Sequence, residues 1–321
     1  MSCLFSNAVA SIRMGVEDFR QQDPDRDISA VRNFYAGVLL LAKEALIRAA
    51  PKAGPDLVIG AKLKPVPDGH GGVAMQQVGQ TTVDFQQIAT RAADFGIALD
   101  AKALGALNKI RNDMEHHYTA EPATAVRAAI SQAFPVAASL FRQLEEEPLD
   151  YLGDLWSAML QTKELYDQEL RAARATMARV KWYSEAVTGE FICNACQQEL
   201  VEQVNPANDD QTQVELRCRT CGASPDLGAA IEAAIEERYG FEAYTRAKET
   251  GDTGPVYACP ACARETLVED AEKCANCGEP IEQDRECSLC GDGIPLGDYL
   301  DGLDEGLCSY CAYKMEKVMR E

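Results

Sequence analysis

The sequence predicts a mainly α-helical N-terminal bundle followed by small cysteine-rich modules that contain short strands. Two observations lead to this prediction. In the first half, apolar residues recur at the three- and four-residue spacing of a helix face. In the second half the cysteines come in close pairs, and twelve of the 13 cysteines follow residue 190. A chain of 321 residues can form several domains, each with a buried core.

The helical bundle is expected to span residues 1–147, with about five antiparallel helices. Helical spacing appears at residues 3–20, 28–50, 82–95, 100–111 and 122–146. Asp27 is the expected N-cap of the second helix, and Pro51 ends it. Residues 51–72 are rich in proline and glycine, which predicts a long excursion between helices.

A single long helix is expected over residues 148–190, connecting the bundle to the cysteine-rich half. Its apolar stripe alternates spacings of three and four residues and contains one charged residue, Lys163. The stripe consists of Leu149, Leu152, Trp156, Met159, Lys163, Tyr166, Leu170, Ala173, Met177 and Val180. Such a heptad stripe either joins two subunits or packs on its own bundle.

The cysteines of the second half form six Cys-x2-Cys pairs, which is the strongest signal in the sequence. The pairs are Cys193 with Cys196, Cys218 with Cys221, Cys259 with Cys262, Cys274 with Cys277, Cys287 with Cys290, and Cys308 with Cys311. Two such pairs supply the four tetrahedral ligands that zinc prefers. Taken in chain order, they predict three structural four-cysteine zinc sites, each closed to substrate. An interleaved pairing among the last eight cysteines is the alternative.

The spacers between paired knuckles, 21, 11 and 17 residues, resemble those of zinc ribbons. We therefore expect a ribbon at 191–224, an acidic spacer helix at 225–254, a second ribbon at 255–282, and a third finger at 283–321. The third finger is a ribbon or treble-clef-like, because Cys308 and Cys311 open a helix-forming segment.

Local details support these ribbons. Gly222, Gly278 and Gly291 each follow a knuckle directly, where the backbone often needs a positive φ. Short strands are expected at residues 191–192 and 214–217, before the first two knuckles.

The two halves of the chain differ in net charge. Residues 1–190 have 24 acids and 20 bases, net −4, whereas residues 191–321 have 27 acids and 11 bases, net −16. Nucleic-acid binding needs Lys and Arg to neutralise phosphates, so we expect a protein partner at the cysteine-rich half. A solvated acidic scaffold, or a nucleic-acid-binding zinc protein with strongly salt-dependent binding, are the alternatives.

No apolar run approaches the roughly 20 residues that a membrane span requires, and the N-terminus lacks the features of a secretory signal. We therefore expect a cytoplasmic protein. Disulfides are rare in that compartment, which again favours metal binding by the cysteines.

The segment LNKIRNDMEHHYTAEP, after the fourth expected helix, contains two of the three histidines. Arg111-Asn112, three residues, His116 and then Tyr118 resemble the R-N-x3-H pattern of HEPN domains and their R-x4-H-x-Y subset. The preceding segment QTTVDFQQIATRAADFGIALD looks like the helix that precedes this pattern in many members. The resemblance covers roughly residues 1–147.

The resemblance implies a metal-independent endoribonuclease that works as a homodimer, with two motifs facing a shared cleft. RNA provides its own nucleophile, the 2′-hydroxyl, so the site needs a proton-transfer group and a cation for the phosphate. Imidazole and guanidinium have these properties. We assign His116 as general acid or base, Arg111 as the phosphate clamp and Asn112 as the orienting residue.

Several alternatives accompany this assignment. His117 also has an allowed spacing, so either imidazole is a candidate. Because helix positions five residues apart point about 140° away from one another, we expect a helix end or kink near Met114, or a group supplied by the partner subunit. Arg111, Asp113 and His116 could instead form a salt-bridged helix end.

The function expected from these features is an RNA-cleaving toxin or defence effector whose zinc ribbons bind a regulatory protein. By analogy with HEPN toxins, Tyr118 is a candidate for regulatory nucleotidylation. The alternative is a non-catalytic, dimeric HEPN-like adaptor that presents its zinc ribbons to a protein.

Overall fold

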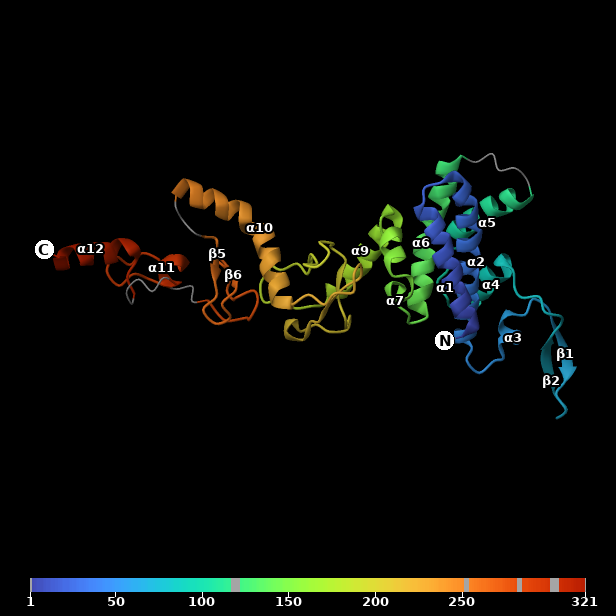
Figure 1. Ribbon diagram of the computed structural model, residues 1–321. Coiled ribbons are helices and arrows are strands. Elements are labelled where there is room, and N and C mark those ends of the chain that lie inside the picture. The colour runs from blue at the N-terminus through green and yellow to red at the C-terminus, as the bar shows by residue number, and fades with distance from the viewer. Residues whose placement is uncertain (1, 117–121, 251–253, 282–284, 301–305, 321) are drawn as a thin grey trace. The chain divides into compact units, whose positions relative to one another are not determined.

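The computed structural model describes residues 2–116, 122–250, 254–281, 285–300 and 306–320. The chain divides into two compact units, Met1–Glu169 and Leu170–Glu321, and the division falls inside one helix, α9 (Figure 1). The first unit is mainly helical, and the second contains short strands, helices and the cysteine pairs.

The helices of the first unit follow the apolar periodicity of the sequence. They are α1 (Cys3–Arg20), α2 (Pro24–Ala49), α3 (Pro55–Ile59), α4 (Phe85–Asp94), α5 (Ala101–His116), α6 (Ala123–Gln143), α7 (Pro148–Leu152), α8 (Asp154–Met159) and the start of α9 (Lys163–Met177). The prediction of a helical N-terminal region is therefore confirmed. The N-cap of α2 is Asp23, not Asp27: Pro24 occupies the first turn, and the buried Asp27 carboxylate instead accepts a hydrogen bond from Arg127 at 2.7 Å.

Helices α1 and α2 pack as a close antiparallel pair. Gly15 lies against Phe34, and Gly37 lies against Ile12. An added Cβ at Gly15 would lie 2.5 Å from the Phe34 backbone nitrogen, so the contact leaves no room for a side chain. Edge-to-face aromatic contacts extend this core to α6, with the Phe34 and Phe134 ring centroids 5.1 Å apart.

The proline- and glycine-rich excursion contains a β-hairpin that periodicity did not predict. Strands β1 (Leu63–Pro67) and β2 (Val73–Gln77) pair antiparallel, with Leu63 opposite Gln77 and Pro67 opposite Val73. At the turn, the Asp68 carboxylate accepts the backbone N–H groups of His70 and Gly72, each at 2.8 Å. Most of this hairpin is exposed, so it lacks the apolar alternation that identifies a half-buried strand.

The expected continuous helix over 148–190 is wrong. The segment forms α7, α8 and α9, and the chain breaks at Gly153, which has φ of 54°, and again before Lys163. The stripe is nevertheless largely buried. Leu152, Trp156 and Met159 are at most 1% exposed within one chain, so this part of the stripe packs on its own bundle.

The second unit contains three short cysteine-bearing modules. Its elements are β3 (Val201–Gln203), the 3-10 turn η1 (Gln211–Gln213), β4 (Leu216–Cys218), α10 (Leu227–Thr250), β5 (Val256–Ala258), β6 (Glu265–Val268), α11 (Leu296–Leu300) and α12 (Ser309–Arg320). Strand β3 pairs antiparallel with β4, and β5 pairs antiparallel with β6. The expected strand at 191–192 is absent, and the strand expected at 214–217 begins at Leu216.

The first two cysteine modules share one hydrophobic core with α10. Phe191 and Leu216 of the first module, Ile231 and Ile235 of α10, and Val268 of the second module are buried together. The N-terminal half of α10 is therefore a core element and not a solvated linker. The third module has a smaller core of its own, in which Ile294 and Leu307 accompany two cysteines.

Gln211 provides a polar connection between the first two modules. Its buried side-chain amide donates to the backbone oxygens of Ala275 and Asn276, at 2.8 and 3.0 Å. Its oxygen accepts the backbone N–H of Tyr183 at 2.8 Å. Because every polar atom of this buried amide is used, it holds the modules in a defined register.

Candidate functional site

The cysteines gather in three clusters of four, grouped in chain order. The clusters are Cys193, Cys196, Cys218 and Cys221; Cys259, Cys262, Cys274 and Cys277; and Cys287, Cys290, Cys308 and Cys311. In each cluster the four sulfur atoms lie within 4.8 Å of one another. The interleaved pairing considered for the last eight cysteines does not occur.

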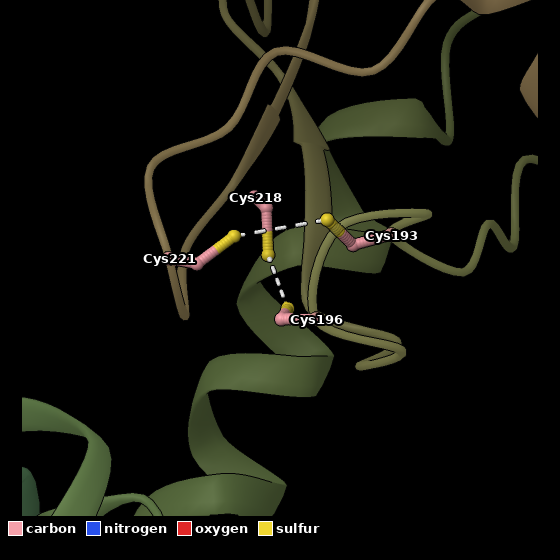
Figure 2. A group of neighbouring side chains, drawn as sticks. All are labelled: Cys193, Cys196, Cys218 and Cys221. Carbon is pink, nitrogen blue, oxygen red and sulfur yellow. Dashed lines mark hydrogen bonds between the residues drawn. The ribbon is translucent and has the colours of Figure 1, made fainter.

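The sulfur spacing fits a tetrahedral zinc ion. In the first cluster, Cys193 Sγ lies 3.7 Å from Cys221 Sγ, and Cys196 Sγ lies 3.6 Å from Cys218 Sγ (Figure 2). Zn–S bonds of about 2.3 Å in tetrahedral geometry place sulfur atoms about 3.8 Å apart. Disulfide sulfurs are about 2.05 Å apart, and all 13 cysteines are free. The clusters are therefore compatible with zinc-binding modules.

The other two clusters have the same spacing. Cys259 Sγ is 3.7 Å from Cys277 Sγ, and Cys262 Sγ is 3.9 Å from Cys274 Sγ. In the third cluster, Cys290 Sγ and Cys308 Sγ are 3.9 Å apart. Four thiolates around one ion leave no position for a substrate, so the zinc in these sites would have a structural role.

One backbone motif recurs in the knuckles and explains how the sulfurs converge. In the first knuckle, Gln197 N–H donates to Cys193 O at 2.8 Å and Cys193 N–H donates to Gln198 O at 2.9 Å. The same two hydrogen bonds recur in the knuckles that begin at Cys218, Cys259, Cys274 and Cys287. The sixth knuckle differs, because Cys308 precedes α12 and Cys311 lies in its first turn. The sequence predicted that these two cysteines open a helix.

The residue after each of these five knuckles has a positive φ. Gly222, Gly278 and Gly291 have φ of 74°, 75° and 74°, as the sequence predicted. At the equivalent positions, Gln197 and Ala263 adopt φ of 60° and 58°. Gln197 and Ala263 therefore adopt a left-handed backbone conformation, which costs a non-glycine residue about 1–2 kcal/mol.

In the second cluster a side-chain hydroxyl contacts a cysteine sulfur. The buried Thr266 hydroxyl lies 3.2 Å from Cys274 Sγ, a contact that no sequence motif indicates. Burial raises the pKa of Cys277 to about 12. Although burial acts in the same direction on Cys262, hydrogen bonds from the Asn276 side chain and the Arg264 backbone lower the pKa of Cys262 to about 6. Such unequal thiols are expected where several anions would crowd together without a cation.

The candidate ribonuclease residues lie at the end of α5. The guanidinium of Arg111 donates to Asn112 Oδ1 at 2.9 Å and pairs with Glu115 at 2.7 Å. The expected helix end or kink near Met114 is wrong, because α5 continues to His116. Within this continuous helix, the directions of residues 111 and 116 diverge by about 140°. The His116 side chain, His117 and Tyr118 lie outside the described residues.

Two residues of α2 also lie near Arg111. The guanidinium of Arg111 lies 6.0 Å from the centroid of the Tyr35 ring, and the Tyr35 hydroxyl donates to Asn108 Oδ1 at 2.6 Å. Burial raises the pKa of Tyr35 to about 12, so this hydroxyl remains a neutral donor. Arg32 Nε lies 3.9 Å from Glu115, which places one carboxylate between two guanidinium groups. Sequence reasoning did not identify these α2 residues, because the contact joins distant segments.

No known family, curated protein or solved structure gives a significant match to this chain. Among the described residues, no helix is long and apolar enough to cross a membrane.

Proposed function

We propose that the protein is a metal-independent endoribonuclease of the HEPN type, a toxin or defence effector whose zinc modules bind a partner protein. The observation that carries this proposal is the placement of Arg111 and Asn112 in contact at the end of α5, with His116 completing the R-N-x3-H pattern. The helical unit around them supports it.

Two arginines, Arg111 and Arg32, would supply the positive charge that a phosphate requires. Arg111 and Arg32 carry two positive charges around Glu115, and the Arg111 side chain is 35% exposed. An RNA phosphate would replace Glu115 as the partner of the Arg111 fork, which can form two parallel hydrogen bonds with it. Asn112 already contacts this guanidinium and would orient it.

Cleavage would proceed by attack of the RNA 2′-hydroxyl on the adjacent phosphate. His116, or alternatively His117, would remove the proton from that hydroxyl and protonate the departing 5′-oxygen, while Arg111 stabilises the phosphorane. Because residues 111 and 116 diverge on a continuous helix, the arginine of one subunit and the histidine of the other would serve one scissile phosphate. The proposal therefore requires a homodimer, and it requires no metal at this site.

An RNA-cleavage assay with the zinc-loaded protein tests this proposal. In a buffer without Mg²⁺ or any other added divalent ion, tRNA, rRNA and mRNA substrates should yield 2′,3′-cyclic phosphate and 5′-hydroxyl ends, and added Mg²⁺ should not raise the rate. Arg111→Ala and His116→Ala should each reduce the rate by at least about 100-fold, consistent with loss of one catalytic group. His70→Ala is the matched control, because His70 lies at the exposed turn of the β1–β2 hairpin.

Expression in cells adds a second readout. The wild type should arrest growth, whereas Arg111→Ala should not. Intact RNA in every substrate class, from protein without a bound inhibitor, would overturn the proposal. His117→Ala assigns the acting imidazole, and intact-mass analysis of Tyr118→Phe tests that residue as a modification site.

A non-catalytic adaptor is the second candidate. Two observations favour it: Arg111 is already paired with Glu115, and the closed cysteine clusters lie in a half with net charge −16. An adaptor would bind its protein partner through residues 191–321, and His116→Ala would leave that binding unchanged. Affinity purification of wild type, His116→Ala and Cys218→Ser tests this binding. A partner that is retained by a protein without RNA-cleaving activity would favour the adaptor over the ribonuclease.

A further inference from the structure

A pocket of about 500 Å³ lies between α10 and the β5–β6 hairpin. Three carboxylates (Glu232, Glu236 and Glu265) and two tyrosines (Tyr239 and Tyr257) line it. Glu232, Glu236 and Tyr239 share one face of α10, because they are spaced four and three residues apart. Its remaining walls are small or apolar, with Gly240, Ala243, Val256 and Ala258.

The carboxylates of this pocket differ in their partners. Glu232 accepts the backbone N–H of Glu265 at 2.8 Å and pairs with Arg264 at 3.2 Å, so it fixes β6 to α10. Glu236 and Glu265 are exposed, and neither has an ion-pair partner among the described residues. Two unpaired carboxylates beside two aromatic rings form a suitable environment for a cationic side chain.

Helix α12 has the complementary chemistry. Three of the eleven basic residues of the cysteine-rich half lie on this helix, with one acid among them, in a half of net charge −16. Lys314 and Lys317 lie one turn apart on the same face, and both are exposed. The Lys314 ammonium lies 4.5 Å from the centroid of the Tyr310 ring.

An apolar stripe lies next to these lysines. It begins at Cys311, which is 8% exposed in the core of the third module, and continues to Met315 and Val318, which are 46% and 72% exposed. The stripe therefore extends beyond the module that it helps to fold. An amphipathic helix with an uncovered apolar face is a common element of helix-in-groove recognition.

We propose that α12 of a second copy of this chain docks at the α10–β5 pocket, with the Lys317 ammonium between Glu236 and Glu265. Lys314 would lie at the pocket rim, and Val318 would cover the small residues of the floor. A two-fold dimer would contain two such contacts, one in each direction. This interface is independent of the ribonuclease proposal, which requires a contact near α5.

Zero-length cross-linking tests the interface directly. The intact zinc-loaded protein is prepared in 14N and 15N forms, mixed, and treated with a carbodiimide, which joins an amine to a carboxylate in contact with it. We expect cross-links from Lys314 or Lys317 to Glu236 or Glu265, with mixed isotopes in the joined peptides. Cross-links within one isotope only, or no cross-links between these segments, would overturn the second-copy proposal.

Charge reversal provides an independent test by sedimentation velocity. Lys314→Glu/Lys317→Glu and Glu236→Lys/Glu265→Lys should each weaken one association step at least about tenfold, and an equimolar mixture should restore it. The mixture restores both contacts, because each reversed surface meets an opposite charge. Glu237→Lys/Glu249→Lys, also on α10 but outside the pocket, is the matched control.

Zinc content and hydrogen exchange verify that each variant remains folded. The proposal is contradicted if neither charge reversal weakens any association step, or if the mixture behaves as its two components do. A dimer through α5 would persist in these variants, but it would give no mixed-isotope α12–α10 cross-link, so the two interfaces remain distinguishable.

Discussion

In the helical unit, phenylalanine, tryptophan, leucine and isoleucine fill the interior, whereas cysteine occupies many interior positions of the second unit. Among the residues that the structure describes, the largest side chains with less than 2% exposure all belong to the helical unit: Trp156, Phe5, Phe34, Phe134 and Phe141. Each cluster of the second unit contains two buried cysteines, one from each of its Cys-x2-Cys pairs. We therefore expect hydrophobic burial to stabilise the first unit by itself, whereas the second unit would also need a cation among its thiolates.

Metal removal should give the largest difference between the two units. A strong zinc chelator should unfold the cysteine-rich unit, because structural zinc contributes about 10–16 kcal/mol of apparent binding free energy in small zinc domains. Helices α1 to α8 should keep their amide protection in hydrogen exchange. Simultaneous unfolding of both units, or full protection of both, would contradict this division.

Single cysteine variants test which modules of the second unit unfold together. Cys218→Ser should expose amides in the first and second modules together, because these modules and α10 share one core. Cys287→Ser should expose mainly amides of the third module, which has its own core, with a smaller effect on the second module through Leu300 of α11. Hydrogen exchange resolves the two patterns, and equal effects of the two variants would show that the second unit is a single cooperative body.

A buried ion pair should give the next largest effect, and only in the helical unit. The Glu169 side chain is 0% exposed and pairs with Arg142. Glu169→Gln leaves Arg142 without its anion, which typically costs about 3–5 kcal/mol. Denaturant unfolding in a Trp182→Phe background reports this loss through Trp156 fluorescence. Glu190→Gln, in the exposed pair with Arg174, should cost at most about 1 kcal/mol.

The close α1–α2 contact predicts a smaller loss. Gly15→Ala places a Cβ 2.5 Å from the Phe34 backbone, and overpacking of this kind costs about 1–3 kcal/mol. At Gly105 in α5, an added Cβ meets only Phe85, at 3.7 Å, so Gly105→Ala should stabilise the helix by up to about 1 kcal/mol. Thermal unfolding should therefore shift in opposite directions for these two variants.

The smallest effects are expected at the knuckles. Gly222→Ala should destabilise the first module by about 1 kcal/mol, because φ at this position is positive. Gln197→Gly and Ala263→Gly should stabilise their modules by a few tenths of a kcal/mol, since glycine removes strain but loses more entropy on folding. Zinc-competition midpoints measure these shifts, and a loss of zinc affinity in the glycine variants would contradict the strain argument.

The sequence predicted the elements of the helical unit well where local periodicity, and not long-range packing, determines their type and bounds. Apolar periodicity located α1 at residues 3–20 as observed, because a regular stripe fixes both type and length. The same periodicity failed over 148–190, since spacing does not reveal the break at Gly153. The exposed β1–β2 hairpin carried no periodic signal.

The cysteine clusters were predictable because pair spacing is local, and five of the six knuckles form through hydrogen bonds within six residues. The residues that surround the clusters were not predictable from the sequence. The shared core of the first two modules depends on tertiary contacts between Phe191, Ile231 and Val268, and the Thr266 contact with Cys274 crosses eight residues without a motif. At the candidate ribonuclease site, the neighbours of Arg111 are Arg32 and Tyr35 of α2, about 75 to 80 residues earlier in the chain.

We expect three four-thiolate zinc sites to stabilise the second unit. Native mass spectrometry of the intact protein, purified without chelators, tests it most directly. We predict three zinc ions per chain and no mass loss from disulfide formation. Fewer than three tightly bound ions, or a mass that is two hydrogens lower for each cysteine pair, would contradict the claim.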